Sequence, residues 1–369
     1  MLGVAFLFPS TFLSSFATEK FAPFSTSWRT AKLHTVLFVP WFRSNSRSLN
    51  APSQHVAVML HEVLEALEPR PGMVFLDGTL GGGGHTKALA EAVKAEDKGA
   101  AGLVIAFDRD PAAIERAEQT LAGLPVVLAN ANYADAPEII EELQLPACGE
   151  QAAPEEVVPD GAVLDGIILD LGLSSDQIAD EQRGFSFHSE GPLDLRFDPT
   201  RGEPAWRLIN HLRPENLADL IYKYGEERMS RRIARAIESE RRKRTLESAR
   251  DVADVIWKAV PAAVRHGRIH PATRTFQALR IAVNEELKWL EVALQRLPGL
   301  LKPGGKIAMI SFHSLEDRLV KQAFRDDPRL EVITRSPRRP AEAETEANPR
   351  SRSAKLRVAR RMVDGGSQS

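Results

Sequence analysis

The sequence predicts an α/β protein with a doubly wound, mostly parallel sheet that an inserted helical domain interrupts. Three observations support this. Short apolar runs typical of buried strands alternate with helical patterns up to about residue 180, which is the pattern of βαβ units. The alternation then stops, and residues 203–296 have mostly helical periodicity. Strand-like sequence resumes near residue 302.

The elements of the first half follow from hydrophobic periodicity and turn residues. Helices are expected at His55–Leu67, at Thr86–Lys94 and from Pro111, because proline favours the first position of a helix. Strands are expected at Met73–Leu76, Leu103–Phe107, Val126–Leu128 and Gly166–Leu169. Polar residues stand just past these strands: Asp77, Asp108, Asn130 and Asp170. Because ligands bind beyond the carboxyl ends of parallel strands, these four positions predict one site.

The domain boundaries follow from the same pattern. Lys302–Lys306 and the apolar run Ile307–Ile310 return to sheet-like sequence after the helical stretch. We therefore predict a main domain of residues 54–180 and 297–361, with a helical substrate-recognition domain at 181–296 inserted into it. Residues 362–369 are expected to be a flexible tail.

Composition narrows the function classes. The chain has 369 residues, 43% hydrophobic and 27% charged, which is typical of a soluble globular protein. Its net charge of -2 means that any nucleic-acid surface must come from local clusters of basic residues. The single cysteine, Cys148, lies in a Pro/Ala/Glu-rich stretch expected to be a loop, and it excludes an internal disulfide and a cysteine-based zinc site. No metal site is expected.

Residues 1–53 differ from the rest of the chain. They contain eight of the sixteen phenylalanines and one acidic residue, Glu19. The apolar run Leu2–Phe16 is shorter than the ~20 residues of a membrane span. The segment suits either an organellar transit peptide or upstream sequence read from too early a start codon, and both interpretations leave it outside the fold. The expected location is the bacterial cytoplasm, or an organelle if the segment is a transit peptide.

A glycine-rich loop follows the first strand. Residues 78–84 read Gly-Thr-Leu-Gly-Gly-Gly-Gly, and glycines at the start of a helix let the backbone approach a ligand closely. The loop lacks the Gly-Lys-Ser/Thr of a phosphate-binding P-loop, and its spacing departs from GxGxxG. These departures favour a nucleoside cofactor smaller than a dinucleotide. Asp108 stands where an acid binds ribose hydroxyls, and Asp110 is expected to cap the next helix.

Ordered motifs then resemble one family. They are His55–Leu60, Asp77–His85, Asp170–Ser175, Arg183–Phe187, Gly191–Arg196, Tyr224–Arg228, His270–Phe276, Ser311–Asp317 and Asn348–Arg357. The sequence from about His55 to Arg361 resembles the ribosomal RNA small subunit methyltransferase H family, also called MraW. The resemblance implies a Rossmann-like class I methyltransferase fold and S-adenosylmethionine as cofactor. It also implies methylation of the N4 amine of a cytidine in the decoding region of 16S ribosomal RNA, within the small subunit.

The resemblance also implies cofactor-binding residues: Gly83, Gly84, His85, Asp108, Tyr133, Asp170 and Gln177. The chain departs from the family in three places. Its opening reads His-Val-Ala-Val-Met instead of His-Val-Pro-Val-Leu, a Cys-rich segment after residue 314 is absent, and residues 1–53 have no counterpart. Roles tied to those segments are not implied here.

Three residues are predicted to act on the substrate. Asp170 and Ser174 belong to the loop after the fourth strand, where base-amine methyltransferases orient the exocyclic amine. The resemblance alternatively assigns Asp170 to the cofactor. His313 follows the late strand and is expected to act either as a general base or in a structural, substrate-positioning role.

Two basic clusters are predicted to bind RNA phosphates. The first is Arg228, Arg231, Arg232, Arg235, Arg241, Arg242, Lys243 and Arg244, with few acids between. The second is Arg335, Arg338, Arg339, Arg350, Arg352, Lys355 and Arg357. The alternatives are a small-molecule methyltransferase, an NAD-dependent oxidoreductase and a non-catalytic assembly factor that binds ribosomal RNA. The sequence leaves open whether the chain forms a homodimer.

Overall fold

The computed structural model describes residues 36–38, 57–94, 102–143, 161–267 and 269–363. Cys148, His55, most of residues 1–53 and the end of the expected tail lie outside the described residues. Within the described residues, no helix combines the length and the apolar character that crossing a bilayer requires.

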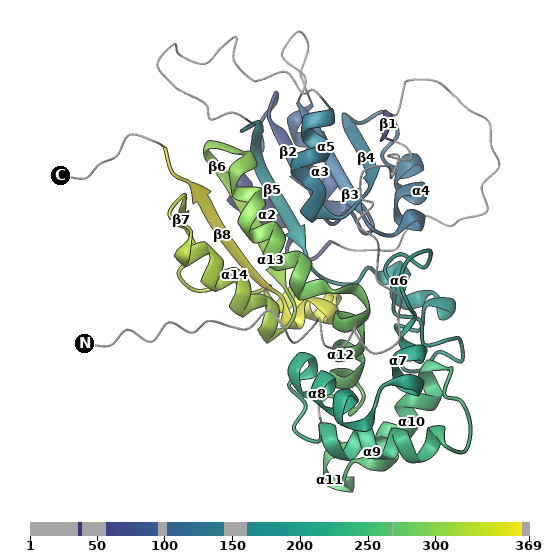
Figure 1. Cartoon of the computed structure of the whole chain (residues 1–369). Helices are drawn as coiled ribbons and strands as arrows, with labels where there is room; N and C mark the ends of the chain where they lie inside the picture. The colour runs from purple at the N-terminus through teal and green to yellow at the C-terminus, as the bar shows by residue number, and fades with distance from the viewer. Residues whose placement is uncertain (1–35, 39–56, 95–101, 144–160, 268, 364–369) are drawn as a thin grey trace, which may run out of the picture. The chain divides into compact units, whose positions relative to one another are not determined.

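An eight-stranded sheet in the order β1-β4-β3-β2-β5-β6-β8-β7 forms the centre of the fold (Figure 1). Its parallel strands are β2 (Val74–Asp77), β3 (Leu103–Asp108), β4 (Val126–Asn130), β5 (Leu164–Asp170) and β6 (Leu301–Ser311). β8 (Lys355–Arg361) runs antiparallel between β6 and β7 (Leu330–Val332). The chain winds outward in both directions from the neighbours β2 and β5, so the predicted doubly wound α/β fold is confirmed.

Helices cover both faces of the sheet. α2 (Leu60–Leu67), α3 (Gly84–Val93) and α4 (Pro111–Thr120) pack in one buried cluster that includes Phe75 of β2. α5 (Ala136–Glu142), α13 (Glu286–Arg296) and α14 (Ser314–Asp326) pack in the other, which includes Leu76. Consecutive residues of β2 thus face opposite layers, because side chains alternate along a strand. Both faces are buried, which explains why these strands are continuous apolar runs.

A separate helical core lies between β5 and α13 in the sequence. It is built from α7 (Ala205–His211), α8 (Pro214–Gly225), α9 (Ser230–Arg241), α10 (Ala249–Ala259), α11 (Ala262–Arg265) and α12 (Thr273–Asn284). Buried residues from Phe185 to Leu279 pack together there in a hydrophobic cluster.

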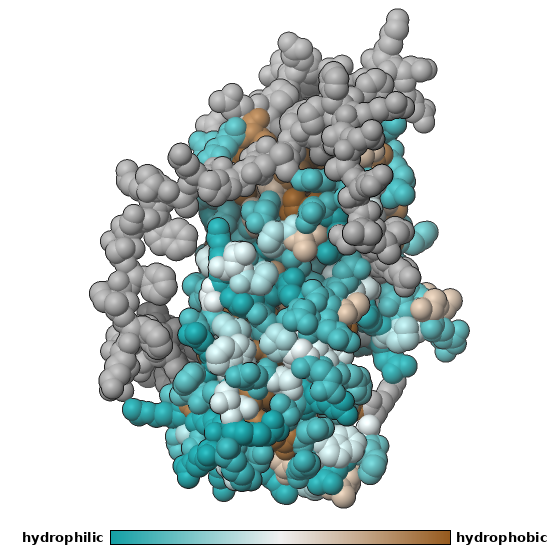
Figure 2. All heavy atoms as spheres, turned by 90° about the vertical axis from the view of Figure 1, so that its right-hand side faces the viewer, coloured by the Kyte–Doolittle hydropathy of each residue, from teal (hydrophilic) through white to brown (hydrophobic). Residues whose placement is uncertain are grey.

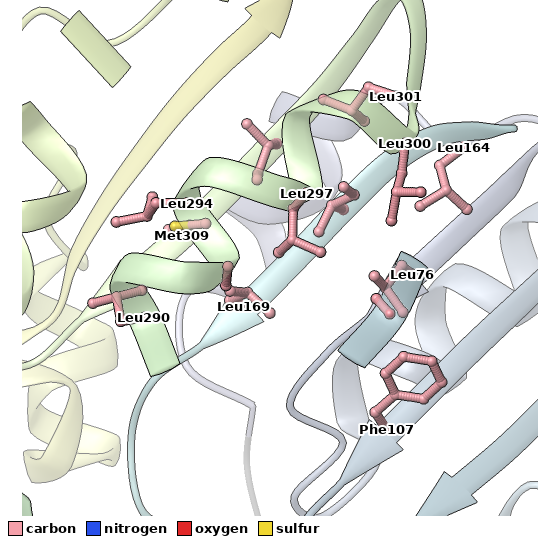
Figure 3. Packing of buried hydrophobic residues seen from close by; sticks show 14 of the residues in the cluster. Leu76, Phe107, Leu164, Leu169, Leu290, Leu294, Leu297, Leu300, Leu301 and Met309 are labelled. Atoms are coloured by element: carbon pink, nitrogen blue, oxygen red, sulfur yellow. The ribbon is translucent and has the colours of Figure 1, made fainter. Parts of the chain in front are cut away.

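The predicted insertion, which ends at residue 296, includes the helix α13, but α13 packs elsewhere. Leu290, Leu294 and Leu297 pack over β5 and β6 in the sheet core, as Figure 3 shows. α13 therefore belongs with the sheet by its packing, and the insertion ends near Glu285, a residue in the left-handed conformation (φ 51°) between α12 and α13. Helical periodicity shows that a helix has an apolar face, but it does not show which core that face joins.

The N-terminal segment contributes one element that the sequence analysis left outside the fold. Val36–Phe38 forms β1, which pairs antiparallel with β4 at the edge of the sheet. Three residues are too few for a periodicity signal, so the composition of the surrounding segment hid this strand.

Candidate functional site

The predicted strand-end residues meet at one edge of the sheet. Asp77, Asp108, Asn130 and Asp170 are the last residues of β2, β3, β4 and β5. A pocket opens beside them. Its lining includes seven residues that were predicted to act on the cofactor or the substrate: Gly84, His85, Asp108, Tyr133, Asp170, Ser174 and Gln177. Gly83 and His313 do not line it.

Asp77 holds the glycine loop in place. Its Oδ1 accepts from the Thr79 amide at 3.0 Å, and its Oδ2 accepts from the Thr86 hydroxyl at 2.6 Å. Burial raises the pKa of Asp77 to about 6, against the opposing effect of these hydrogen bonds. Both oxygens are engaged within the loop and the first turn of α3, so Asp77 is a structural residue of the site.

The glycines of the loop have separate roles. Gly83 precedes α3 with φ 78°, a left-handed conformation that glycine adopts without strain. A Cβ atom on Gly84 would lie 2.8 Å from Cβ of Ala57, so only glycine lets the start of α3 pack there. Gly83 therefore shapes the turn, and Gly84 lines the pocket.

Asp108 is fixed by two backbone amides. Its Oδ2 accepts from Gly81 at 2.8 Å and its Oδ1 from Asp110 at 2.8 Å. Burial is the main cause that raises the pKa of Asp108 to about 6. An ionised carboxylate offers about four acceptor positions, so Asp108 keeps capacity for two hydroxyl donors in the pocket.

Asp110 does more than cap a helix. Its Oδ1 accepts from the Ala112 amide at 3.1 Å, which confirms the predicted cap of α4. Its Oδ2 also lies 3.1 Å from the Arg183 guanidinium and accepts from Gln177 at 3.3 Å. The residue joins α4 to the first turns of the insertion.

Asp170 has an unused acceptor. Its Oδ1 is buried and makes no hydrogen bond among the described residues. Its backbone amide donates to the Thr79 hydroxyl at 2.6 Å. Burial, with help from the nearby Asp77 charge, raises the pKa of Asp170 to about 7. A buried carboxyl oxygen without a partner is costly, and it indicates a place for a ligand.

His85 is a neutral histidine. Its Nε2 lies 3.0 Å from the carbonyl oxygen of Val58, and its Nδ1 lies 4.0 Å from Asp170. Burial lowers the pKa of His85 to about 4, so the ring is uncharged near neutral pH. Its position at the second residue of α3 ties the glycine loop to the residues before α2.

Ser174 and Gln177 form a capping box at α6 (Ser175–Ala179). The Ser174 hydroxyl accepts from the Gln177 amide, and the Gln177 side chain accepts from the Ser174 amide, both at 3.1 Å. This pairing shapes the loop after β5. Across the pocket, Tyr133 packs so closely that a Cβ on Gly78 would lie 2.8 Å from Tyr133 Cβ.

His313 caps α14 beside two buried acids that the sequence analysis missed. Its Nδ1 lies 3.4 Å from the Glu316 amide, whereas Glu316 and Glu286 themselves line the pocket. Position after a strand end could have identified Glu316. Glu286 and Arg350 come from segments whose placement next to the pocket depends on tertiary packing. No sequence signal marks Glu286, and Arg350 was predicted only as a member of the second basic cluster. Other lining residues to which the sequence analysis gave no role of their own include Thr79, Phe197 and Phe312.

The first basic cluster divides into two parts. Arg241, Arg242, Lys243 and Arg244 form ion pairs with Glu238 or Glu240, which the sequence analysis underweighted. Arg228, Arg231, Arg232 and Arg235 are exposed and form no ion pair within the described part of the chain. Hydrophilic residues predominate over the lower part of the face in Figure 2, at the level of α8–α11 in Figure 1.

The second basic cluster does not form one surface. Arg357 is buried, and both it and Lys355 pair with Asp317. Arg350 lines the pocket and donates to the Ser175 hydroxyl. Arg338 pairs with Glu65, and the remaining members are exposed: Arg335, Arg339 and Arg352.

Comparisons with known proteins identify a family and several relatives. The chain matches the model of the MraW methylase family over residues 52–362. It is 49% identical over 314 residues to the ribosomal RNA small subunit methyltransferase H of a Synechococcus strain, covering 84% of this chain and 92% of that protein. Proteins of the same name from Syntrophotalea carbinolica and Rhodopirellula baltica are 46% and 45% identical, covering 84% and 86% of this chain and 98% and 95% of theirs.

Proposed function

This chain belongs to the MraW methylase family, and on that premise we propose that it methylates small-subunit ribosomal RNA with S-adenosylmethionine as methyl donor. The proposed target is the N4 amine of a cytidine in the decoding region. The observation that carries the proposal is the convergence of Asp108, Asp170 and the glycine loop on one pocket. The proposed location is the bacterial cytoplasm, or an organelle if residues 1–53 are a transit peptide.

The pocket residues fit an adenosyl sulfonium. Asp108 has acceptor capacity for two ribose hydroxyls, and Gly81 and Gly84 leave room for close approach along the loop. Tyr133 offers an aromatic ring at the end of β4, where it would stack on a base. The acidic edge of the sheet suits a cation. When bound, S-adenosylmethionine supplies an electrophilic methyl group.

The chain's own residues must orient a weak nucleophile. The lone pair of a cytosine amine is delocalised into the ring, so hydrogen-bond acceptors are needed to hold the amine in line. The free Oδ1 of Asp170 and the carbonyls of residues 170–175 are one such acceptor set. The competing assignment gives Asp170 to the cofactor, and a structure with cytidine bound separates the two by the distance from N4 to this loop.

The target base must leave its stack to reach a pocket at the sheet edge. The exposed arginines of α9 and the turn before it are suited to hold the surrounding phosphates. A small-molecule methyltransferase would have no use for such a surface. An assay with ribosomal RNA as substrate therefore tests the substrate class and the reaction together.

The decisive experiment is methyl transfer from labelled S-adenosylmethionine to small ribosomal subunits that lack the modification, followed by nucleoside analysis. We expect label in N4-methylcytidine, and a large loss of rate in Asp170→Ala. The exposed Asp326→Ala serves as a control for folding, because Asp326 is the last residue of α14 and pairs with its neighbour Arg325. Label in another nucleoside, or none in folded protein that binds the cofactor, would refute the proposal.

A further inference from the structure

We propose that Glu286 and Glu316 form an acidic wall that accepts hydrogen bonds from the exocyclic amine of the target base and so selects cytidine over uridine. The inference rests on the proposed function and adds two substrate-contacting residues to it. Both side chains line the same pocket as Asp108 and Asp170.

The order of strands places the wall at the substrate end of the pocket. Along the sheet edge, β3 with Asp108 is followed by β2, by β5 with Asp170, and by β6. Glu316 lies in the first turn of α14, which follows β6, and therefore on the far side of Asp170 from the ribose-binding position. Glu286 opens α13, which packs in the same buried cluster as α14.

The two carboxyl groups converge. Glu286, His313 and Glu316 each bring one side-chain atom within 4.8 Å of the others. Glu316 and Glu286 are only 2% and 8% exposed, so both are withdrawn from bulk water while they border the pocket. Two buried acids this close need compensating donors.

The donors present leave acceptor capacity unused. Oε2 of Glu316 accepts from the amides of Phe312 and His313, at 2.9 and 3.4 Å, and Oε1 lies 3.0 Å from Nε2 of His313. Arg280 donates to both oxygens of Glu286, at 2.8 and 2.9 Å. Since a carboxylate has about four acceptor positions, each acid can take a further donor from the pocket. The surrounding contacts hold the two side chains in fixed orientations.

A wall of acceptors distinguishes bases by their exocyclic group. Cytosine presents an N4 amine, a donor, where the corresponding group of uracil is a carbonyl oxygen. An amine satisfies the buried carboxylates, whereas a carbonyl leaves them unpaired and faces them with a like partial charge. Sites built to hydrogen-bond an N–H group reject analogues that lack it far more strongly than apolar sites do.

A divalent cation is the other occupant that the same three side chains would admit. Arg280 argues against it, because its guanidinium pairs with Glu286 and brings to the cluster a positive charge that would repel a cation. Metal binding is accordingly an outcome that the test must detect.

The test uses the full chain and the isosteric variants Glu316→Gln and Glu286→Gln, with Glu291→Gln as control, since Glu291 is exposed on the same helix as Glu286. Cytidine and uridine monophosphate are titrated onto protein loaded with S-adenosylhomocysteine. We expect the unchanged protein and the control to prefer cytidine monophosphate at least tenfold, and each variant to lose most of that preference. Methyl transfer should fall at least tenfold in kcat/KM, with cofactor affinity changed less than about threefold.

Retained preference in a variant that still binds the cofactor overturns the inference, as does the absence of any preference in the unchanged protein. If Glu316→Gln fails to fold, Glu286→Gln decides alone. Loss of activity on chelation, restored by Mg²⁺ or Zn²⁺ in the unchanged protein but not in the variants, assigns the cluster to a metal instead. Failure of the proposed function is distinct, because the unchanged protein would then transfer no methyl group to ribosomal RNA.

Discussion

Three aspartates end the adjacent strands β3, β2 and β5, and each has different hydrogen-bond partners. Asp77 accepts from Thr79 and Thr86 and does not line the pocket, whereas Asp108, which two backbone amides hold, does. Asp170 retains a buried oxygen that has no partner among the described residues. The same residue type at the same position in the sheet thus gives one structural acid and two that can bind a ligand.

Replacing Asp108 should weaken cofactor binding. Asp108→Ala removes the acceptors for two hydroxyls and the anchor of the Gly81 amide, so we expect the dissociation constant of S-adenosylmethionine to rise roughly tenfold to a hundredfold. Asp108→Asn keeps one acceptor oxygen and should have a smaller effect. Calorimetry measures both, and an unchanged constant in Asp108→Ala would remove this residue from the site.

Cofactor affinity should also depend on pH. The pKa of Asp108 is raised to about 6 and that of Asp170 to about 7, mainly by burial. Protonation removes negative charge and turns an acceptor oxygen into a donor, so affinity should fall as the pH is lowered from about 8 to about 5. In Asp108→Asn the fall below pH 6 should be smaller than in the unchanged protein. Calorimetric titrations across this pH range measure how the cofactor affinity changes with pH. Tighter binding at low pH would contradict the prediction.

Helix α9 has two kinds of basic residue. Those at its C-terminal end are paired with acids, whereas Arg231, Arg232 and Arg235 project from it as exposed charges. An ion pair must be broken before its arginine can neutralise a phosphate, so the exposed residues nearer the start of the helix are better suited to bind RNA.

A pair of triple variants tests this distinction. Changing Arg231, Arg232 and Arg235 to glutamine should reduce the salt dependence of RNA binding, by roughly 0.7 in the log–log slope for each phosphate that is no longer neutralised. The matched control changes Arg242, Lys243 and Arg244, which pair with Glu238, Glu240 and Asp251. Equal slopes for the two triple variants would show that pairing does not decide which arginines bind.

At the scale of the whole molecule, a buried joint connects the insertion to the sheet domain. Arg183 pairs with Asp110 and donates to the carbonyls of Arg196 and Phe197 at 2.9 and 2.8 Å. Asn284 accepts from the Phe197 amide at 2.7 Å, and its own carbonyl accepts from Arg109. The first and last parts of the insertion therefore both form hydrogen bonds with residues at the start of α4, through Asp110 and Arg109.

Breaking this joint should destabilise the protein. Arg183→Met leaves the buried carboxylate of Asp110 without its cation, and the loss of one partner of a buried pair costs about 3–5 kcal/mol. We expect the midpoint of urea-induced unfolding, monitored by circular dichroism, to fall to a lower urea concentration. Arg201→Met is the control, because the Arg201 side chain is 83% exposed although it also pairs with an aspartate. Similar midpoints for the two variants would contradict the proposed importance of the joint.

Strands β2 to β6 could be predicted from the sequence because each is an apolar run that is bounded by glycine, proline or an acid. The site could be predicted in part, since Asp108, Asp170 and the glycine loop sit at strand ends. The place of Glu286 in the site could not be predicted, because periodicity does not show which hydrophobic core its helix, α13, joins. The position of Arg350 in the pocket could not be predicted either. The sequence does not show which basic residues near the C-terminus are buried, which are exposed and which line the pocket.

The strand order has a consequence for synthesis of the chain. β5 ends at residue 170 and its neighbour β6 begins at residue 301, so residues 171–300 emerge from the ribosome while one side of β5 has no partner. An apolar strand with an open edge is prone to pair with other chains. Nascent or truncated chains that stop before residue 301 should therefore be prone to aggregate.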